Sequence, residues 1–110
     1  MAPKVWYQVR DLDAARSFYR EMLGFEETGV DFSERWSLLK HGAMEIGLAE
    51  GEPDEDGGVA HVDVPDLKAE ADRLRAAGVD VGIVFELQGE MRLLDVYDPD
   101  GNRVQLAQEL

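Results

Sequence analysis

The sequence predicts an α+β protein made of two tandem βαβββ modules, because one strand–cap–helix pattern occurs twice along the chain. Val9-Arg10-Asp11-Leu12 opens the first helical segment, and Val64-Pro65-Asp66-Leu67 opens the second. Gly24 and Gly78 end the two segments. Positions 11 and 66 are 55 residues apart, whereas the two glycines are 54 apart, so the helical segments differ in length by one residue. An internal repeat of this kind indicates a duplicated fold.

Each copy begins with an alternating run, residues 4–9 and 59–64, which predicts a strand. Asp11 and Asp66 follow these strands and are predicted to cap the next helix. Apolar residues then recur at helical spacing: Leu12, Ala15, Tyr19 and Met22 in the first copy, and Leu67, Ala71 and Leu74 in the second. A glycine directly after such a segment typically adopts the left-handed conformation that stops a helix. Each helix is therefore predicted to bury one face.

The remaining strands are predicted from short runs rich in Val, Ile, Leu and aromatic residues. These runs are residues 36–39, 44–48, 79–85, 91–97 and 104–107. Residues 98–102, Asp-Pro-Asp-Gly-Asn, predict a turn between the last two strands, since proline presets φ and glycine or asparagine tolerates positive φ. Each half of the chain is thus expected to be βαβββ.

Length and charge limit the kind of protein. A chain of 110 residues suits one domain, here divided into module one (1–49), an acidic linker (50–58) and module two (59–110). The net charge of −13 argues against nucleic acid; it either attracts a cationic ligand or maintains solubility. The linker's acids are expected to be solvated: Glu50, Glu52, Asp54, Glu55 and Asp56. Without a leader or a long apolar run, a soluble cytoplasmic protein is expected.

Several catalytic arrangements have no basis in the sequence. Cysteine is absent. The serines lack a histidine and an acid at a recognisable spacing: Ser17, Ser33 and Ser37. The glycines at 57–58 precede a strand instead of a helix, so they do not form a phosphate loop. His41 precedes Gly42 in a predicted hairpin turn and is expected to be solvated.

Three segments carry a family resemblance: residues 9–12, residues 18–25 (Phe-Tyr-Arg-Glu-Met-Leu-Gly-Phe) and residues 98–106 (Asp-Pro-Asp-Gly-Asn-Arg-Val-Gln-Leu). Together they resemble the glyoxalase, bleomycin resistance and extradiol dioxygenase superfamily, also called vicinal oxygen chelate proteins. The resemblance covers nearly the whole chain. It implies that the strands of both modules curl into a mixed sheet with a cleft. It also implies a homodimer, since the bleomycin resistance relatives are typically dimers whose clefts form between subunits.

The same resemblance predicts where a metal would bind. Metal-dependent members place one ligand on each of four strands, usually His or Gln, Glu, His and Glu. Carried over to this sequence, those positions are Lys4, Val59, Gln105 and either Glu45 or Gly47. A lysine ammonium has no lone pair, and valine has no donor atom. The family metal site is therefore predicted to be absent, and no cofactor is expected.

The predicted cleft suits a small organic ligand, including a cationic one. Its expected ligand-binding residues share the inward face of their strands: Trp6, Gln8, His61, Asp63, Arg103 and Gln105. For Trp6 the alternative is ordinary core packing. For His61 and Asp63, one interpretation is an acid–base or ligand pair. The other is a histidine satisfied by a neighbouring group, beside an acid that lines a polar wall.

Three functions are compatible with these observations, and the first one below is the predicted function. The chain binds or sequesters a small molecule without metal, as bleomycin resistance proteins do. Alternatively, it is a lyase, isomerase or dioxygenase-like enzyme acting next to a carbonyl, with His61 or Glu45 as base and Arg103 or Lys4 holding the developing charge. Those two basic residues could instead form an ion pair with Glu45 or Asp63. The third possibility is an accessory interaction domain without a small ligand.

Overall fold

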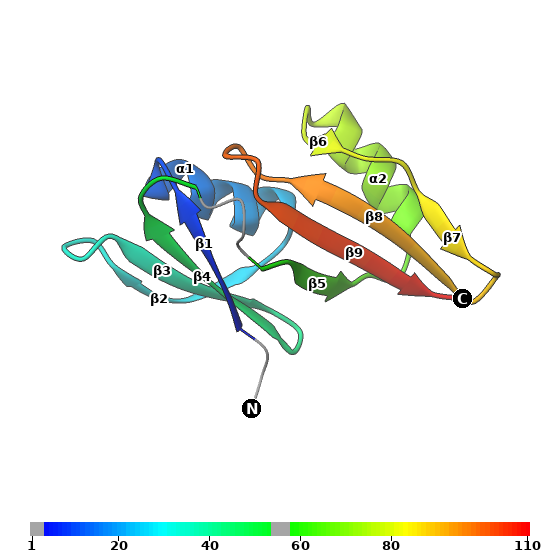
Figure 1. Cartoon of the computed structure of the whole chain (residues 1–110), viewed down its shortest axis with the longest axis horizontal. Helices are drawn as coiled ribbons and strands as arrows, with labels where there is room; N and C mark the ends of the chain where they lie inside the picture. The colour runs from blue at the N-terminus through cyan, green and yellow to red at the C-terminus, as the bar shows by residue number, and fades with distance from the viewer. Residues whose placement is uncertain (1–3, 54–57) are drawn as a thin grey trace.

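The computed structural model describes residues 4–53 and 58–110. Figure 1 shows two sheets side by side, one for each half of the chain. The first sheet has the order β1-β4-β3-β2. Its strands are β1 (Lys4–Val9), β2 (Glu26–Asp31), β3 (Trp36–His41) and β4 (Met44–Glu50). β1 and β4 run parallel, and the other neighbours are antiparallel.

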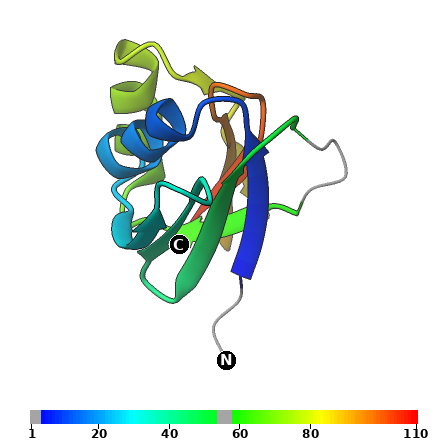
Figure 2. The ribbon, with the colours of Figure 1, turned by 90° about the vertical axis from the view of Figure 1, so that its left-hand side faces the viewer.

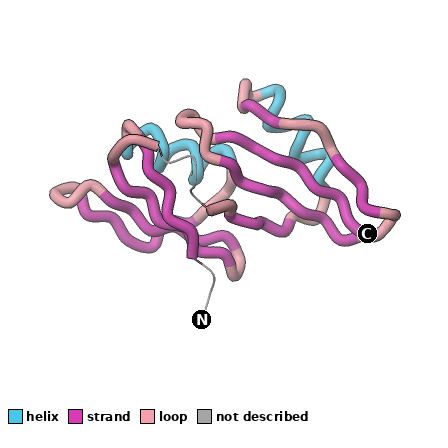
Figure 3. The backbone as a smooth tube through the Cα atoms, in the orientation of Figure 1, coloured by secondary structure: helices cyan, strands magenta, loops and turns pink. Residues whose placement is uncertain are grey.

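The second sheet repeats this arrangement with the order β5-β9-β8-β6. Its strands are β5 (Ala60–Asp63), β6 (Asp80–Val81), β7 (Phe85–Leu87), β8 (Met91–Tyr97) and β9 (Arg103–Glu109), with β7 also paired to β8. Again the first and last strands of the module pair in parallel. The backbone trace in Figure 3 shows both sheets as the dominant structure. The predicted α+β fold of two repeated modules is confirmed.

Two strand predictions need correction. The first module contains a strand that was not predicted, β2. Its residues are exposed or half-buried and begin Glu-Glu-Thr-Gly, so a search for apolar runs does not find it. The single strand predicted for residues 79–85 is wrong, since this stretch forms β6 and the start of β7, and residues 82–84 between them belong to no strand. Within that segment Ile83 is 82% exposed. The proposed boundaries at 1–49, 50–58 and 59–110 stay a prediction.

The helices confirm both caps and revise the first helix. α1 (Leu12–Ser17) is capped by Asp11, whose carboxylate accepts a hydrogen bond from the Ala14 amide. α2 (Leu67–Ala76) is capped in the same way by Asp66, which accepts from the Ala69 amide. Gly24 and Gly78 have φ of 74° and 82°. However, α1 passes directly into a π-helical turn, η1 (Phe18–Met22). The wider turn accommodates the extra residue of the first copy, so that Tyr19 is still fully buried.

The core lies between the helices and one face of each sheet. Figure 2 shows both helical segments on the same side of the sheets, which leaves the opposite side uncovered. Tyr7 joins the two modules, since its hydroxyl donates to the Arg103 carbonyl at 2.6 Å and accepts from the Ala60 amide at 2.9 Å. Burial raises the pKa of Tyr7 to about 12, so this hydroxyl stays protonated. Tyr19 donates to the buried carboxylate of Asp98 at 2.9 Å.

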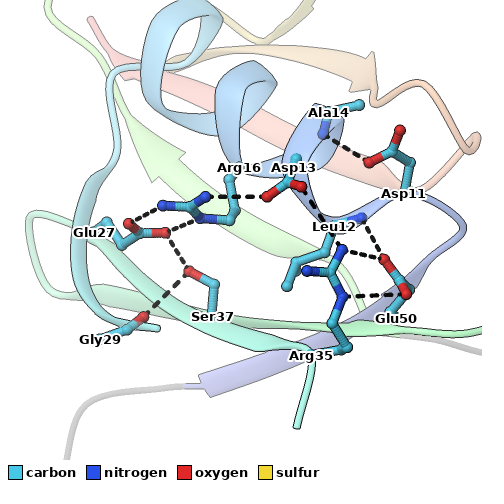
Figure 4. Close-up of polar contacts among 10 residues, drawn as sticks. All are labelled: Asp11, Leu12, Asp13, Ala14, Arg16, Glu27, Gly29, Arg35, Ser37 and Glu50. Carbon is cyan, nitrogen blue, oxygen red and sulfur yellow. Dashed lines mark hydrogen bonds and ion pairs between the residues drawn. The ribbon is translucent and has the colours of Figure 1, made fainter. Parts of the chain in front are cut away.

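Two arginine–glutamate pairs fasten α1 to the first sheet (Figure 4). Arg16 donates two hydrogen bonds to Glu27, at 2.6 and 2.7 Å. Arg35 donates to Glu50 at 2.7 Å, and Glu50 also accepts the Leu12 amide at 3.0 Å. Glu50 is exposed, as expected of a solvated acid, but it is the last residue of β4 and is held by these contacts. The acids at positions 54–56 lie outside the described residues.

Candidate ligand-binding site

The open face of the sheets carries the side chains that alternation predicts. On β1, Trp6 and Gln8 are exposed, whereas Tyr7 and Val9 are buried under the helices. On β5, His61 and Asp63 are exposed beside the buried Ala60 and Val62. On β9, Arg103 and Gln105 lie opposite the buried Val104 and Leu106. The two modules therefore present these polar and aromatic side chains on the face that no helix covers, as their shared parity predicts.

Trp6 forms a flat aromatic surface on the open face. It is 49% exposed, so it is not a core residue. Its ring lies directly against Gly47, the residue paired with it across β1 and β4, and a Cβ added at Gly47 would overlap the ring. The absent side chain lets the indole lie against the sheet while about half of the residue stays exposed. Such a surface can stack against a planar ligand.

A cavity of about 430 Å³ lies where the β3–β4 hairpin meets β5. His61 and Asp63 line it. His41 also lines it, which corrects the expectation of a solvated turn histidine: the residue is half-buried, and its ring packs against Phe25 with centroids 5.5 Å apart. The hairpin turn carries His41 to the other module, a long-range contact that local sequence does not encode. The rest of the wall is largely apolar, formed by Val5, Ala43, Met44 and Val59 together with Gly42.

Gln105 sits in the middle of a polar row that crosses the second sheet. It pairs with His61 on one side and with Asp95 on the other. Asp95 forms an ion pair with Arg103, with Oδ2 and Nη1 3.6 Å apart. The alternative pairing of Arg103 with Glu45 or Asp63 is therefore not the one that the structure shows. The Oδ1 atom of Asp95 is buried and has no hydrogen-bond partner among the described residues. A buried oxygen without a donor is costly, and it marks Asp95 as a polar group available for pairing.

Asp95 was missed at the sequence level. It lines a small hollow of about 180 Å³ with Gln105, Ile83 and Phe85. The alternating pattern of β8, with Leu94 and Val96 buried, would have placed Asp95 on the open face. Its pairing with Gln105 and Arg103 depends on strand register, which the sequence does not give.

A family model identifies the chain. The model of the "Glyoxalase/Bleomycin resistance protein/Dioxygenase superfamily" matches residues 3–106. The chain belongs to this superfamily. Among curated proteins none matches the sequence significantly. The description of the superfamily includes both resistance proteins and enzymes, so membership alone does not choose between binding and catalysis.

Several solved structures have a similar fold and align with nearly the whole chain. The integron cassette protein HFX_CASS4, from the mobile metagenome of Halifax Harbour Sewage Outfall, is 23% identical with a TM-score of 0.84, covering 98% of this chain and 97% of its own. TnmS3, an antibiotic binding protein from Streptomyces sp. CB03234, is 25% identical with a TM-score of 0.81, covering 100% and 96%. A bleomycin resistance determinant encoded on the transposon Tn5 is 19% identical with a TM-score of 0.77, covering 99% and 98%. These likenesses support the glyoxalase fold.

The strand register decides between Glu45 and Gly47 as the counterpart of Gln105. In the second module Gln105 pairs with His61, two residues after Val59. In the first module the residue two after Lys4 is Trp6, and it pairs with Gly47. By this correspondence Gly47 is the first-module counterpart of Gln105, whereas Glu45 pairs with Lys4.

The residues that the resemblance places at the metal positions do not fit a divalent metal by the chemistry of their donor atoms. They are Lys4, Gly47, Val59 and Gln105, of which only the neutral amide oxygen of Gln105 is a side-chain donor. Across residues 4–53 and 58–110, no three His, Cys, Asp or Glu side chains come together in a group that could hold a metal ion.

Among the described residues, the helices lack the length and apolar composition that a membrane-spanning helix needs.

Proposed function

We propose that this superfamily member binds and sequesters a small, flat organic ligand on the open face of its sheets, without metal chemistry. The observation that carries the proposal is the half-exposed indole of Trp6 lying against Gly47. An aromatic surface of this kind binds planar, apolar ligands, and the polar row of His61, Gln105 and Asp95 supplies the few hydrogen bonds that orient them. The antibiotic-binding protein TnmS3 has a similar fold and supports the same class of function.

The ligand site is proposed to close between two copies of the chain. Large apolar side chains are exposed on or beside the open face: Trp6, Ile83, Phe85 and Leu87. Exposed apolar groups of this size favour association. Light scattering coupled to size-exclusion chromatography, over a hundredfold range of concentration, should give twice the chain mass of 12.3 kDa. A monomer throughout this range contradicts the two-chain site but leaves a one-chain site possible.

The binding proposal is tested by thermal shift with antibiotics that carry a planar aromatic group, beginning with metal-free bleomycin, and fosfomycin, which has no planar group, is the negative control. A ligand at about 100 times its Kd stabilises the folded state by about 2.7 kcal/mol, a shift of several degrees. Trp6→Ala should remove at least about 1.4 kcal/mol of that binding, a tenfold loss. Phe32→Ala is the control, since Phe32 is 54% exposed but belongs to the β2–β3 turn and packs on Arg16. Equal losses in both variants would contradict a ligand site at Trp6.

The cavity lined by His41, His61 and Asp63 favours a second candidate function, a metal-independent proton transfer next to a carbonyl. A histidine is the side chain best suited to exchange protons near neutral pH. Under this proposal an α-keto or hydroxy-carbonyl substrate would show saturable turnover, lost in His61→Ala while the melting temperature is unchanged. Turnover that survives in His61→Ala would contradict this role.

A further inference from the structure

A cavity lined mainly by η1 and by the end of α2 lies on the helix side of the molecule. It has a volume of about 530 Å³ and lies between η1, the end of α2 and the β8–β9 turn. These segments come together near the middle of the molecule in Figure 1, where the two modules meet. We propose that this cavity binds a small organic cation with an apolar body, of the arylalkylammonium class. It would be a second site, independent of the ligand proposed for the open face.

The walls suit an apolar or aromatic body. Phe18 and Met22 come from η1, Val79 follows α2, and Tyr97 ends β8. The first three are partly buried apolar side chains packed against the core, so the wall is held in place. Phe18 and Met22 are four residues apart in the π-helical turn, and both reach this cavity. Aromatic rings attract an ammonium group placed over their faces, which adds charge selection to apolar burial.

The polar lining selects a positive charge. Its ionisable side chains are Asp80, Tyr97 and Asp98, and no Lys, Arg or His belongs to the described lining. Asp98 is 5% exposed. Its carboxylate accepts from the Asp100 and Asn102 amides, the Asn102 side chain and the Tyr19 hydroxyl. All of these donors are neutral.

No ion pair reaches Asp98 within the described residues; on the same turn, Arg10 pairs with Asp100 at 3.3 Å instead. A buried carboxylate without a cationic partner is incompletely compensated, because hydrogen bonds from neutral groups do not cancel its charge. A cation in the adjoining cavity would gain Coulomb attraction to Asp98, which water screens less than it screens the exposed carboxylate of Asp80. An anion of the same shape would be repelled by both carboxylates.

Three ligands of matched shape test the proposal by NMR titration of the full ¹⁵N-labelled chain: phenethylammonium, 2-phenylethanol and 3-phenylpropionate. With the cation, the amide signals of Gly78 and Gly101, which line the cavity, should shift in a saturable way. The alcohol should bind at least about tenfold more weakly, and the carboxylate should leave these signals unmoved. Equal binding of cation and alcohol, or cation shifts confined to Trp6 and His61, would overturn the proposal. Of these two results, only shifts confined to Trp6 and His61 would indicate binding on the open face.

A pair of charge variants separates the cavity from the general acidity of the chain. Asp80→Asn should weaken phenethylammonium binding by about three- to tenfold, because one carboxylate of the lining is lost. Asp72→Asn is the matched control, since it removes the same charge from an exposed position of α2 outside the lining. The two variants have equal net charge. Equal affinities in both would show that only long-range attraction to the −13 charge is at work, and would overturn the proposed site.

Discussion

At the scale of single residues, the open face depends on a glycine. Gly47 leaves the space in which the Trp6 ring lies, and an added methyl group would overlap that ring. We therefore expect Gly47→Ala to turn the indole away from the sheet. Because Trp6 is already half-exposed, the free energy of unfolding should fall by only about 1 kcal/mol, near the lower limit for overpacking. Ligand binding on this face should be lost.

The Gly47→Ala prediction can be checked by the fluorescence of Trp6 in a Trp36→Phe background, since the chain has two tryptophans. The emission should move to longer wavelength, and acrylamide should quench it more efficiently. Gly42→Ala is a poor control, because Gly42 has φ of 59° and would be strained. Ala49→Ser, a small change on the same strand, serves better. Unchanged emission in Gly47→Ala would refute the packing of Trp6 on this glycine.

At the scale of elements, each helix begins at an aspartate that the sequence identifies. Asp66 accepts the Ala69 amide at 3.1 Å, and Asp11 accepts the Ala14 amide at the same distance. Replacing Asp66 by alanine should lower the free energy of unfolding by about 1 kcal/mol, the usual cost of losing an N-cap. Asp66→Asn should cost little, since asparagine caps equally well. Urea unfolding of the three proteins tests this, and equal losses in both variants would indicate a role for charge instead of capping.

The pair of Arg16 and Glu27 joins α1 to β2 and predicts an acid-sensitive contact. Hydrogen bonds from Arg16 lower the pKa of Glu27 below its ordinary value of 4.5. A lowered pKa in the folded state means that the contribution to stability is present above pH 4.5 and is lost as the pH falls through the folded value. Glu27→Gln should therefore unfold at lower urea than the parent at pH 7, and this difference should shrink towards pH 3.

The control for this pH dependence is Glu26→Gln, because Glu26 is exposed and its oxygen lies 4.0 Å from Lys40. That variant should show little difference from the parent at either pH. If the difference for Glu27→Gln were constant between pH 7 and pH 3, the ionised form of Glu27 would not be the stabilising one.

At the scale of the whole molecule, the Tyr7 hydroxyl connects backbone groups of the second module to the first. It serves the Arg103 carbonyl and the Ala60 amide together. Tyr7→Phe removes both hydrogen bonds and leaves two polar groups unpaired, so the free energy of unfolding should fall by about 2–4 kcal/mol. Tyr97→Phe is the control, since its hydroxyl makes no hydrogen bond within the described residues. Calorimetry of both variants measures the effect, and equal melting temperatures would refute the role of Tyr7.

Local patterns were sufficient for several features of this protein. The caps Asp11 and Asp66, the stops at Gly24 and Gly78, and the alternation that puts Trp6 on the open face all depend on residues close in sequence. Periodicity and the chemistry of short side chains encode them directly. The motif resemblance added the superfamily, which the family model confirms. Local patterns were therefore enough to predict the duplicated fold, the start of each helix and the alternation of its first strands.

Contacts between residues far apart in the sequence became visible only in the folded chain. The strand register pairs Gly47 with Trp6 and places Asp95 beside Gln105 and Arg103. The β3–β4 hairpin places His41 in a cavity that His61 also lines. The sequence shows that the first helical segment has one extra residue. It does not show that this residue is accommodated in the wider π-helical turn η1. Such contacts join strands separated by a hairpin or by a whole module. Their geometry follows from packing of the complete chain, because no local periodicity fixes which residues of two strands pair.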